Sequence, residues 1–418
     1  MEMKKCKLSE IATVEISGVD KKAKENEKPI KLCNFTDVYH NWAITRDMEI
    51  SFMDATATDK EIDTFVLKKG QVAFTKDSET RDDIGIPTYI ADDFDNVILG
   101  YHTALITPDK TKLSGKYLNA FMNSNFIKKY FENNASGSGQ RYTLSNVTLN
   151  SIPIILPEIS IQEKIGEFFS NIDRKIALNK KINAKLEAMA KRLYDYWFVQ
   201  FDFPNEEGNP YKSSGGKMVW NEVLKREIPD GWEVKRLEDV ISTSCERINT
   251  NDIENQYYVP IEVIPRNKMS FHETANLDKA TTGLCSFKKR SILLSNRRVY
   301  FHKVCISPFD GITRDTVIII NPKQQENLGF VYQIVNSNHF IDYATVHSYG
   351  SEQPVLSTPA VLNYKIIHPN RDLDKEYSRK TESIISQVLQ NELEIQKLTK
   401  LRDRLLPLLM NGQVEVDE

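Results

Sequence analysis

The sequence contains the same pattern twice, and this internal repeat limits the possible folds more than any other feature. Residues 7–11 (KLSEI) resemble residues 236–240 (RLEDV), a displacement of 229 positions from Lys7 to Arg236. Residues 67–74 resemble residues 287–294 at a displacement of 220, and Leu144-Ser145 resembles Leu356-Ser357 at 212. The displacement shrinks along the chain, as expected if two copies of one domain differ in loop length. A chain of 418 residues is long enough for both copies.

Each copy combines strand patterns with helical patterns. Short apolar runs bounded by Gly, Pro, Asp or Asn, such as residues 71–74, 97–99 and 316–320, predict strands. One stretch in each copy, residues 116–132 and 328–343, has the three- and four-residue spacing of a helix. The predicted fold class is therefore α+β, with two mixed α/β domains of about 150 residues each.

Two longer stretches predict helices with matching apolar seams. The first seam follows Pro157 and comprises Ile165, Phe168, Ile172, Asn179, Ile182, Leu186, Met189, Leu193 and Tyr196. The second comprises Tyr377, Ile384, Asn391, Leu398, Leu401, Leu405 and Leu408. At 1.5 Å per residue the first helix would be roughly 55 Å long.

Asn179 and Asn391 occupy the same position of the two seams, because they too are 212 residues apart. An amide in an apolar seam costs stability but fixes the register, since a slip would leave it facing apolar partners. We therefore expect the two helices to pair with each other, antiparallel if a pseudo-twofold axis relates the halves. The alternative is that each helix lies on its own globular domain.

These features divide the chain into five segments. We expect a first domain over residues 1–157, a long helix over 158–199, a connector over 200–233, a second domain over 234–372, and a second long helix with its tail over 373–418. The connector is rich in Gly, Pro and Ser. Aromatic residues flank its ends and either pack against the helices or contact a partner protein; they are Trp197, Phe198, Trp220 and Trp232.

Composition and motifs exclude several classes of protein. The five cysteines are scattered and form no Cys-x-x-Cys, so we expect neither a disulfide framework nor a zinc site. No apolar run is long enough to span a membrane, and the start has no apolar signal core, which favours the cytoplasm. The sequence contains no phosphate-binding loop and no His-Glu-x-x-His. We therefore expect no catalytic residues and no metal ligands.

A net charge of −3 neither favours nor excludes a polyanionic partner, because binding depends on where the charges lie. Between Lys279 and Phe309 the sequence has seven basic residues and no acid: Lys279, Lys288, Lys289, Arg290, Arg297, Arg298 and Lys303. Since Arg can form paired hydrogen bonds with guanine or phosphate, residues 295–298 are candidates for DNA contacts. The alternative is a solvated strand face.

Flexible loops with small and polar residues provide further candidates. In the first copy the candidate DNA-binding residues are Lys76, Ser78, Thr80, Arg81, Ser138, Gln140, Arg141 and Tyr142. In the second copy they are Ser295, Asn296, Arg297, Arg298, Ser351 and Gln353. These segments suit phosphate and adenine contacts, although ordinary solvent-exposed loops have the same composition.

The chain resembles the DNA-specificity subunits of Type I restriction–modification enzymes (the HsdS family) over nearly its whole length. The matching motifs are residues 67–80 (LKKGQVAFTKDSET), 100–102 (GYH), 152–157 (IPIILP), 161–165 (IQEKI), 196–208 (YWFVQFDFPNEEG), 213–216 (SSGG), 228–232 (IPDGW) and 405–413 (LLPLLMNGQ). The second copy departs from the pattern at one point, because Arg290 stands where the first copy has Gly70.

The resemblance implies two target-recognition domains separated by two long antiparallel coiled-coil helices. Each domain would recognise one half of a bipartite DNA site, while the helices would set the spacer and dock two modification subunits. The chain itself would be non-catalytic and carry no cofactor. S-adenosylmethionine would belong to the modification subunits, and ATP and Mg2+ to restriction subunits where these are present. Two alternatives from other classes are a single-chain DNA methyltransferase or nuclease, and a coiled-coil adaptor with no role in DNA binding.

Overall fold

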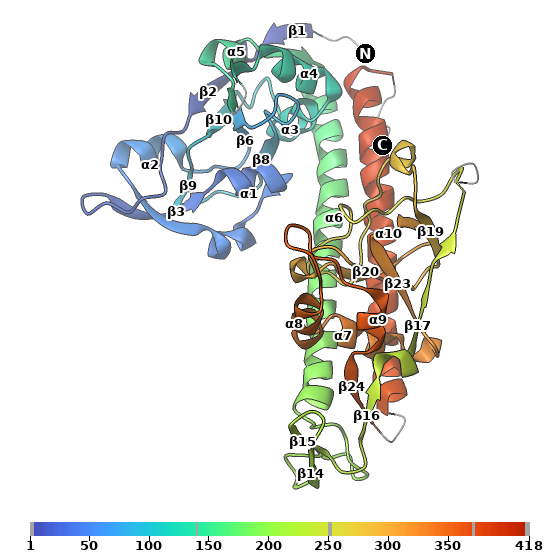
Figure 1. Cartoon of the computed structure of the whole chain (residues 1–418). Helices are drawn as coiled ribbons and strands as arrows, with labels where there is room; N and C mark the ends of the chain where they lie inside the picture. Colours follow the sequence, from blue (N-terminus) through green and yellow to red (C-terminus); the bar gives the residue numbers. More distant parts are fainter. Residues whose placement is uncertain (1–3, 139–140, 250–252, 370–372, 414–418) are drawn as a thin grey trace. The chain divides into compact units, whose positions relative to one another are not determined.

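The computed structural model describes residues 4–138, 141–249, 253–369 and 373–413. It divides into two compact units: unit 1 comprises residues 1–175 and 398–418, and unit 2 comprises residues 176–397. Figure 1 labels their helices and strands. The division falls inside the two long helices, α6 (Ile159–Tyr194) and α10 (Leu373–Met410).

Unit 1 is built around a five-stranded sheet with the order β2-β10-β6-β8-β4. Its strands are β2 (Ala12–Ile16), β10 (Thr103–Pro108), β6 (Val72–Thr75), β8 (Pro87–Ile90) and β4 (Ala43–Ile44). A second sheet, β5-β3-β9, contains β5 (Met53–Ala57), β3 (Lys28–Cys33) and β9 (Val97–Leu99). The helices of this unit before α6 are α1 (Phe35–His40), α2 (Asp59–Phe65), α3 (Gly115–Met122), α4 (Asn125–Asn134) and α5 (Asn146–Asn150). Strands β6, β8 and β9 are buried along their whole length, which places the core between these elements.

Unit 2 has a four-stranded sheet with the order β17-β23-β20-β21. Its strands are β17 (Ile241–Ser244), β23 (Val317–Pro322), β20 (Ile292–Ser295) and β21 (Val304–Ile306). A smaller sheet contains β18 (Glu246–Arg247), β19 (Leu284–Phe287) and β22 (Gly311–Arg314). The short helices are α7 (Leu328–Val335), α8 (Asn338–Val346) and α9 (Thr358–Leu362).

The two units share a four-stranded core topology, β2-β10-β6-β8 in one and β17-β23-β20-β21 in the other, which confirms two related mixed α/β domains. The pair β1 (Lys4–Lys7) with β13 (Pro153–Leu156) corresponds to β16 (Glu233–Arg236) with β24 (Lys365–His368). The central strands β6 and β20 are displaced by the 220 residues that the sequence indicates, from Val72 to Ile292. Helices α5 and α9 are displaced by 212 residues, from Asn146 to Thr358. The repeat is thus one of secondary structure and not only of sequence.

The prediction of a single amphipathic helix in each copy was wrong, because both stretches form two helices. The first breaks between α3 and α4, and the second between α7 and α8. The reason is a serine at each break. The Oγ atom of Ser124 accepts a hydrogen bond from the amide of Ile127, and Ser337 does the same for Phe340, so each serine caps a new helix.

The two long helices contact each other within unit 2 and run antiparallel there. Asn179 of α6 donates to Glu394 of α10, and Ala190 of α6 accepts from the Tyr377 hydroxyl of α10, so rising numbers on one helix meet falling numbers on the other. The alternative in which each helix packs only on its own domain is therefore wrong.

The apolar seam of α6 differs from the predicted one at every second position. Ile176, Asn179, Asn183 and Ala190 are buried, whereas Met189 is 56% exposed. On α10, Leu401 is also exposed. The predicted seam and the observed one share Asn179 and both advance by threes and fours. Spacing alone therefore does not distinguish them, and the packing of unit 2 decides between them.

The connector contributes to the core of unit 2. Trp197, Phe198 and Trp232 are buried in its main apolar cluster, whereas Trp220 is 58% exposed. Trp220 lies on a hairpin formed by β14 (Met218–Asn221) and β15 (Arg226–Pro229). Three of the four aromatic residues therefore pack in the core. Trp220 is exposed and remains a candidate for contact with a partner protein.

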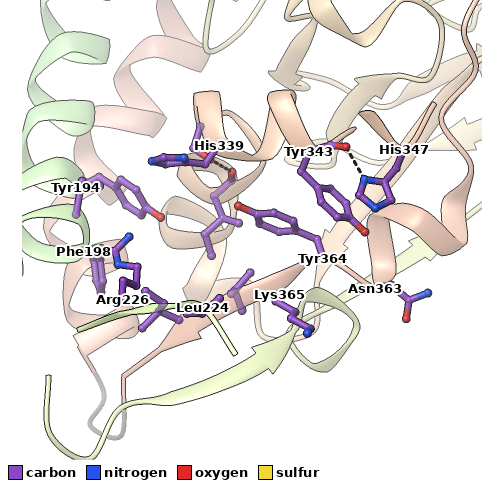
Figure 2. A pocket seen from close by; sticks show the side chains of 15 residues that line it. Tyr194, Phe198, Leu224, Arg226, His339, Tyr343, His347, Asn363, Tyr364 and Lys365 are labelled. Carbon is purple, nitrogen blue, oxygen red and sulfur yellow. Dashed lines mark hydrogen bonds between the residues drawn. The ribbon is translucent and has the colours of Figure 1, made fainter. Parts of the chain in front are cut away.

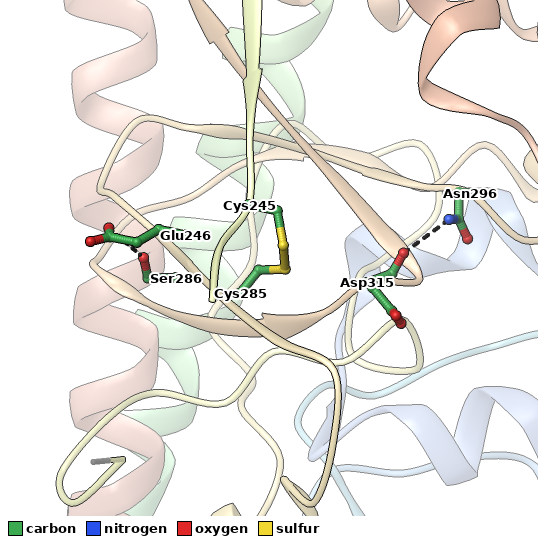
Figure 3. Close-up of a disulfide and its surroundings, with 6 residues drawn as sticks. All are labelled: Cys245, Glu246, Cys285, Ser286, Asn296 and Asp315. Atoms are coloured by element: carbon green, nitrogen blue, oxygen red, sulfur yellow. Dashed lines mark hydrogen bonds between the residues drawn. A yellow bond between two sulfur atoms is a disulfide. The ribbon is translucent and has the colours of Figure 1, made fainter. Parts of the chain in front are cut away.

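The sequence predicts no disulfide framework, but the structure contains one disulfide among the described residues. Cys245 and Cys285 are joined in unit 2, with their Cα atoms 5.0 Å apart (Figure 3). The cause is the antiparallel ladder of β18 and β19, in which Arg247 pairs with Cys285 and so brings Cys245 close. The two cysteines are separated by 40 residues, and the sequence gives no sign that they pair. The pairing follows only from the register of the two strands.

No helix in the part of the chain that the structure describes is both long enough and apolar enough to span a membrane.

Candidate nucleic-acid interface

The candidate residues of unit 1 converge because β6 continues into β7 (Asp77–Ser78), which pairs with β12 (Arg141–Thr143). Tyr142 is opposite Ser78, and β12 also pairs with β11 (Ser136–Ser138). Residues 77–78 therefore lie beside residues 142–143, although the sequence separates them widely. Gln140 and the side chain of Ser138 lie outside the described residues.

A buried carboxylate organises this surface. The Asp77 Oδ2 atom lies 2.6 Å from His102 Nδ1 and 3.1 Å from Arg141 Nη2, and Lys76 Nζ donates to Asp77 Oδ1 at 3.0 Å. Burial raises the pKa of Asp77, but hydrogen bonds from Thr143, Lys76 and His102 outweigh it and lower the pKa to about 2. The site therefore holds a permanent anion that orients three cationic or polar side chains.

The exposure of these partners differs. The Lys76 side chain is 17% exposed and also donates to Thr143, so most of its hydrogen-bonding capacity is used inside the protein. The Arg141 side chain is 57% exposed while one end of its guanidinium is held by Asp77. Arg141 is therefore a preoriented cation at the surface, whereas Lys76 is a supporting residue.

Aromatic rings surround these charges. The Arg81 guanidinium lies 5.0 Å from the centre of the Tyr142 ring, and the rings of Tyr101 and His102 are 3.9 Å apart. Lys76, Asp77, Tyr101, His102 and Arg141 line an open cleft of about 520 Å3. Ser78 and Thr80 follow Asp77 along the chain, and the Ser78 hydroxyl accepts a hydrogen bond from the Thr80 amide at 3.2 Å. Stacking faces next to a fixed cation suit contacts to nucleic acid.

Unit 2 forms an equivalent surface from its own copy of these segments. Arg297 pairs with Val355, and Val355 pairs with Tyr349, which reproduces the pairing of Asp77, Thr143 and Ser136 in unit 1. Ser351 and Gln353 are exposed in the turn between Tyr349 and Val355. The candidates of the second copy thus also come together at one surface.

Two of these candidates mainly shape the loop. The Ser295 hydroxyl is buried and donates to the carbonyl of Arg297 at 2.9 Å. The Asn296 amide donates to the carbonyl of Asp315 at 3.0 Å (Figure 3). Arg298 adopts a left-handed backbone conformation with φ at 46°. Arg297 and Arg298 are the partly exposed cations of the segment.

The basic stretch of the second copy does not form one patch. Arg290 pairs with Glu382 of α10, and Lys303 Nζ donates to the carbonyl of Ile261 at 2.6 Å. Burial lowers the pKa of Lys303, as expected for an ammonium group taken partly out of water. These two cations therefore have structural roles.

Sequence reasoning missed several residues of the two surfaces. Asp77, Tyr101 and His102 were not among the candidates, although residues 100–102 follow a buried strand and match a family motif. In unit 2 the Arg266 guanidinium lies 3.9 Å from the centre of the Phe301 ring, and Tyr300 beside it is 49% exposed. The aromatic residues after residues 295–298 were a visible signal for this second group.

The two asparagines expected to fix the helix register are both buried in unit 2 and bond across the helix pair. Asn179 Nδ2 donates to Glu394 Oε2 at 2.8 Å, and Asn391 Nδ2 donates to Asn183 Oδ1 at 2.7 Å. Asn183 also donates to Glu392, whose other oxygen lies 2.6 Å from His272 Nδ1. The network includes Asn183, which the sequence analysis did not select.

Among the described residues, no group of three or more His, Cys, Asp or Glu side chains is arranged to hold a metal ion.

Comparison with known proteins gives the family of the chain. The profile described as "Type I restriction modification DNA specificity domain" matches residues 1–188 and 229–402, which includes both candidate surfaces. The chain belongs to this DNA-specificity family. The fold class and the family that the sequence indicates are thereby confirmed.

Named relatives agree with this assignment. The Type I restriction enzyme HindI specificity subunit of Haemophilus influenzae is 23% identical over 412 residues, covering 83% of this chain and 87% of that protein. The MjaIX specificity subunit of Methanocaldococcus jannaschii is 27% identical over 332 residues, covering 74% of this chain and 71% of that protein. The crystal structure of an S subunit from M. genitalium has a similar fold, with a TM-score of 0.57 at 14% identity over 100% of this chain and 97% of that one.

Proposed function

We propose that this member of the specificity family recognises a bipartite DNA site, with one half recognised by each unit. The observation that carries the proposal is the pair of equivalent surfaces, one formed by β7 and β12 and the other by residues 297 and 355. The same backbone positions carry opposite charges, since Asp77 corresponds to Arg297. Recognition of two different half-sites requires two surfaces at equivalent positions that carry different side chains.

The side chains proposed to contact DNA in unit 1 are Arg141, Arg81 and Tyr142, with Ser78 and Thr80 beside them. In unit 2 they are Arg297, Arg298, Ser351 and Gln353. The exposed arginines supply charge for phosphates and donors for guanine. Asn179 and Asn391 would hold the helix pair in register and so fix the spacing of the half-sites.

In this proposal the chain is a non-catalytic subunit without a cofactor of its own. Two modification subunits with S-adenosylmethionine would dock on the helices and the connector and methylate adenine. Restriction subunits, where present, would supply ATP- and Mg2+-dependent cleavage. The proposed location is the cytoplasm.

Long-read methylation mapping of the host, with and without the gene for this chain, tests the proposal. We expect one bipartite motif to lose methylation when the gene is deleted and to regain it when the gene is restored. An Arg141→Ala/Arg81→Ala variant should lose methylation of that motif or relax one half of it. Arg236→Ala, which removes an exposed arginine outside both surfaces, is the control and should restore the motif fully.

The alternatives give different results. Purified chain that methylates or cleaves DNA without partners would show a single-chain enzyme. Gel shifts with the purified complex should weaken steeply as salt rises, because phosphate contacts release counterions. A complex that shows no DNA affinity at low salt would leave only an adaptor role.

A further inference from the structure

A cavity in unit 2 lies outside both candidate DNA surfaces. It has a volume of about 620 Å3 and is formed where the end of α6, the connector hairpin, α8 and β24 meet. Figure 2 shows Tyr194 and Tyr364 extending toward one another from different segments. Phe198 and Tyr343 add two more aromatic rings to the wall. The interior therefore suits an apolar or aromatic group.

The hydroxyl groups in this wall are proton donors at neutral pH. Burial raises the pKa of Tyr364 to about 12, and burial also raises the pKa of Tyr194. The Tyr343 hydroxyl is already used, since it donates to the carbonyl of Ala360 at 3.1 Å.

The ionisable side chains in the cavity wall, tyrosines aside, are all basic. Arg226, Lys365, His339 and His347 belong to its wall, and none of the described residues that line it is an aspartate or a glutamate. In the described part of the chain no ion pair joins Arg226, Lys365 or His339 to a carboxylate.

The Arg226 guanidinium rests 5.0 Å from the centre of the Phe201 ring, which holds it in place without neutralising it. Asp195, adjacent to Tyr194, is paired with Lys191. The cavity therefore lacks a negative partner.

Exposed apolar side chains continue the surface beyond the cavity. Val199, in its wall, is 41% exposed. On the hairpin that supplies Leu224 and Arg226, Val223 is 53% exposed and Trp220 58% exposed. A ligand confined to the cavity would leave these side chains in water, whereas a polypeptide segment could cover them as well. A phosphate backbone would gain nothing from covering them.

We propose that this cavity is a docking site for a segment of a partner protein that inserts an aromatic side chain and places carboxylates against Arg226 and Lys365. Carboxylates beside these two side chains would supply the missing negative charge, and the ring would fill the space between Tyr194, Tyr343 and Tyr364. The site is separate from the DNA surfaces, and it rests on the proposed function only in that the end of α6 and the connector are where modification subunits are proposed to dock.

The probe is a short fluorescein-labelled peptide in which one tryptophan is flanked on both sides by glutamates, and binding to the full chain is followed by fluorescence anisotropy. A second peptide has glutamine in place of every glutamate, and a third has alanine in place of the tryptophan. We expect the first peptide to bind about tenfold more tightly than either control peptide, because two ion pairs and one buried ring are involved.

Variants locate the binding. Arg226→Glu/Lys365→Glu should weaken the acidic peptide about tenfold and abolish its advantage over the glutamine peptide. Asn363→Trp adds bulk at the exposed margin and should also weaken binding, which provides a second variant that changes no charge. Lys279→Glu/Lys289→Glu makes the same double charge reversal at two exposed positions outside the cavity and should leave binding unchanged. Thermal unfolding checks that each variant is folded.

Several outcomes would overturn the proposal. One is equal affinity for the acidic and the glutamine peptides; another is an unchanged affinity in both cavity variants. If free indole-3-acetate binds as tightly as the peptide, the site takes a small aromatic acid instead. If a short DNA duplex binds and both cavity variants lose it, the occupant is nucleic acid.

Discussion

Single side chains distinguish the two units at equivalent backbone positions. Gly70 and Arg290 both have a positive φ, at 97° and 72°, and both amides donate to a neighbouring strand, to Ile90 and Ser307. Glycine adopts this conformation freely, whereas arginine does so at a cost. Arg290 compensates through a two-point ion pair with Glu382, at 2.9 and 2.6 Å. The departure from the family pattern thus keeps the backbone and adds a contact.

Arg290→Ala and Arg290→Gly separate these two effects. Both lose the ion pair, so Arg290→Ala should lower the free energy of unfolding by about 0.5–1 kcal/mol. Arg290→Gly should be about 1 kcal/mol more stable than Arg290→Ala, since glycine removes the left-handed strain. Urea denaturation of the full chain measures both, with Glu382→Gln as the control for the ion pair alone. A glycine variant less stable than the alanine variant would contradict this explanation.

Asp77 predicts a specific acid sensitivity of unit 1. Its pKa is lowered from 3.8 to about 2 in the folded protein, so the folded state favours the carboxylate. The resulting stabilisation is complete above the unfolded pKa and disappears as the pH falls through about 2. We expect a contribution on the order of 1–2 kcal/mol at neutral pH, and Asp77→Asn should remove it.

The measurement is the difference in unfolding free energy between wild type and Asp77→Asn at several pH values. The difference should be largest at neutral pH and shrink between about pH 4 and pH 2. Asp239→Asn, which removes a carboxylate that accepts only a local backbone amide, should show a smaller effect. A difference that does not depend on pH would mean that Asp77 contributes packing but not charge.

At the scale of the elements, the contact between α6 and α10 in unit 2 is polar as well as apolar. Asn183 forms hydrogen bonds across it with Asn391 and Glu392, His272 contacts Glu392 from outside the two helices, and apolar residues such as Ile385 and Val388 fill the rest. A buried network of this kind fixes register because every slip leaves polar groups without partners. The helix pair is therefore specified by its amides as well as by its apolar spacing.

Glu187 of α6 makes this helix contact sensitive to pH in the opposite direction to Asp77. Burial raises its pKa from 4.5 to about 7, which outweighs the amide of Met269 and the charge of Lys268. The folded state thus favours the protonated acid, and stability falls as the pH rises from about 4.5 through 7. Glu187→Gln should gain about 2–3 kcal/mol relative to wild type above pH 7 and nothing at pH 4. Chemical denaturation at both pH values tests this, with the exposed Glu163→Gln as the control.

The proposed spacer role of the helices leads to a further prediction. Inserting one heptad into α6 near Asn179 and one at the facing point of α10 keeps the seam in phase and lengthens the helix pair by roughly 10 Å. Methylation mapping should then find both half-sites unchanged and the spacer about 3 base pairs longer, at 3.4 Å per base pair. An unchanged spacer in a stable, active variant would count against a ruler.

At the scale of the whole molecule, one chain carries two units of the same topology with different surface chemistry. Each unit has its own core, its own central strand and its own paired loops. Arg81, Tyr142 and Arg141 characterise the first surface, and Arg297 and Arg266 with Phe301 the second. This arrangement makes the specificities separable in principle.

Replacing residues 234–372 with the matching domain of another family member tests that separability. We expect the methylated motif to change in one half and keep the other half. Thermal unfolding of the hybrid verifies that the exchange left it folded. A change in both halves would show that the two units do not act independently.

The sequence by itself determined the features that depend on residues close together along the chain. The repeat, the long helices and the polar loops after the central strands are all encoded in local spacing, and the structure contains each of them. The helix breaks at Ser124 and Ser337 are local too, but the apolar periodicity around these serines concealed them.

Only the tertiary structure decided which distant residues meet. His102 and Arg141 reach Asp77 across 25 and 64 residues, and Cys245 reaches Cys285 across 40. Such pairs depend on strand order and register, to which every residue of a sheet contributes, so no short stretch of sequence encodes them. The same holds for Asn183: the predicted seam passes through Asn179 but not Asn183, and only the packing of the folded unit buries both.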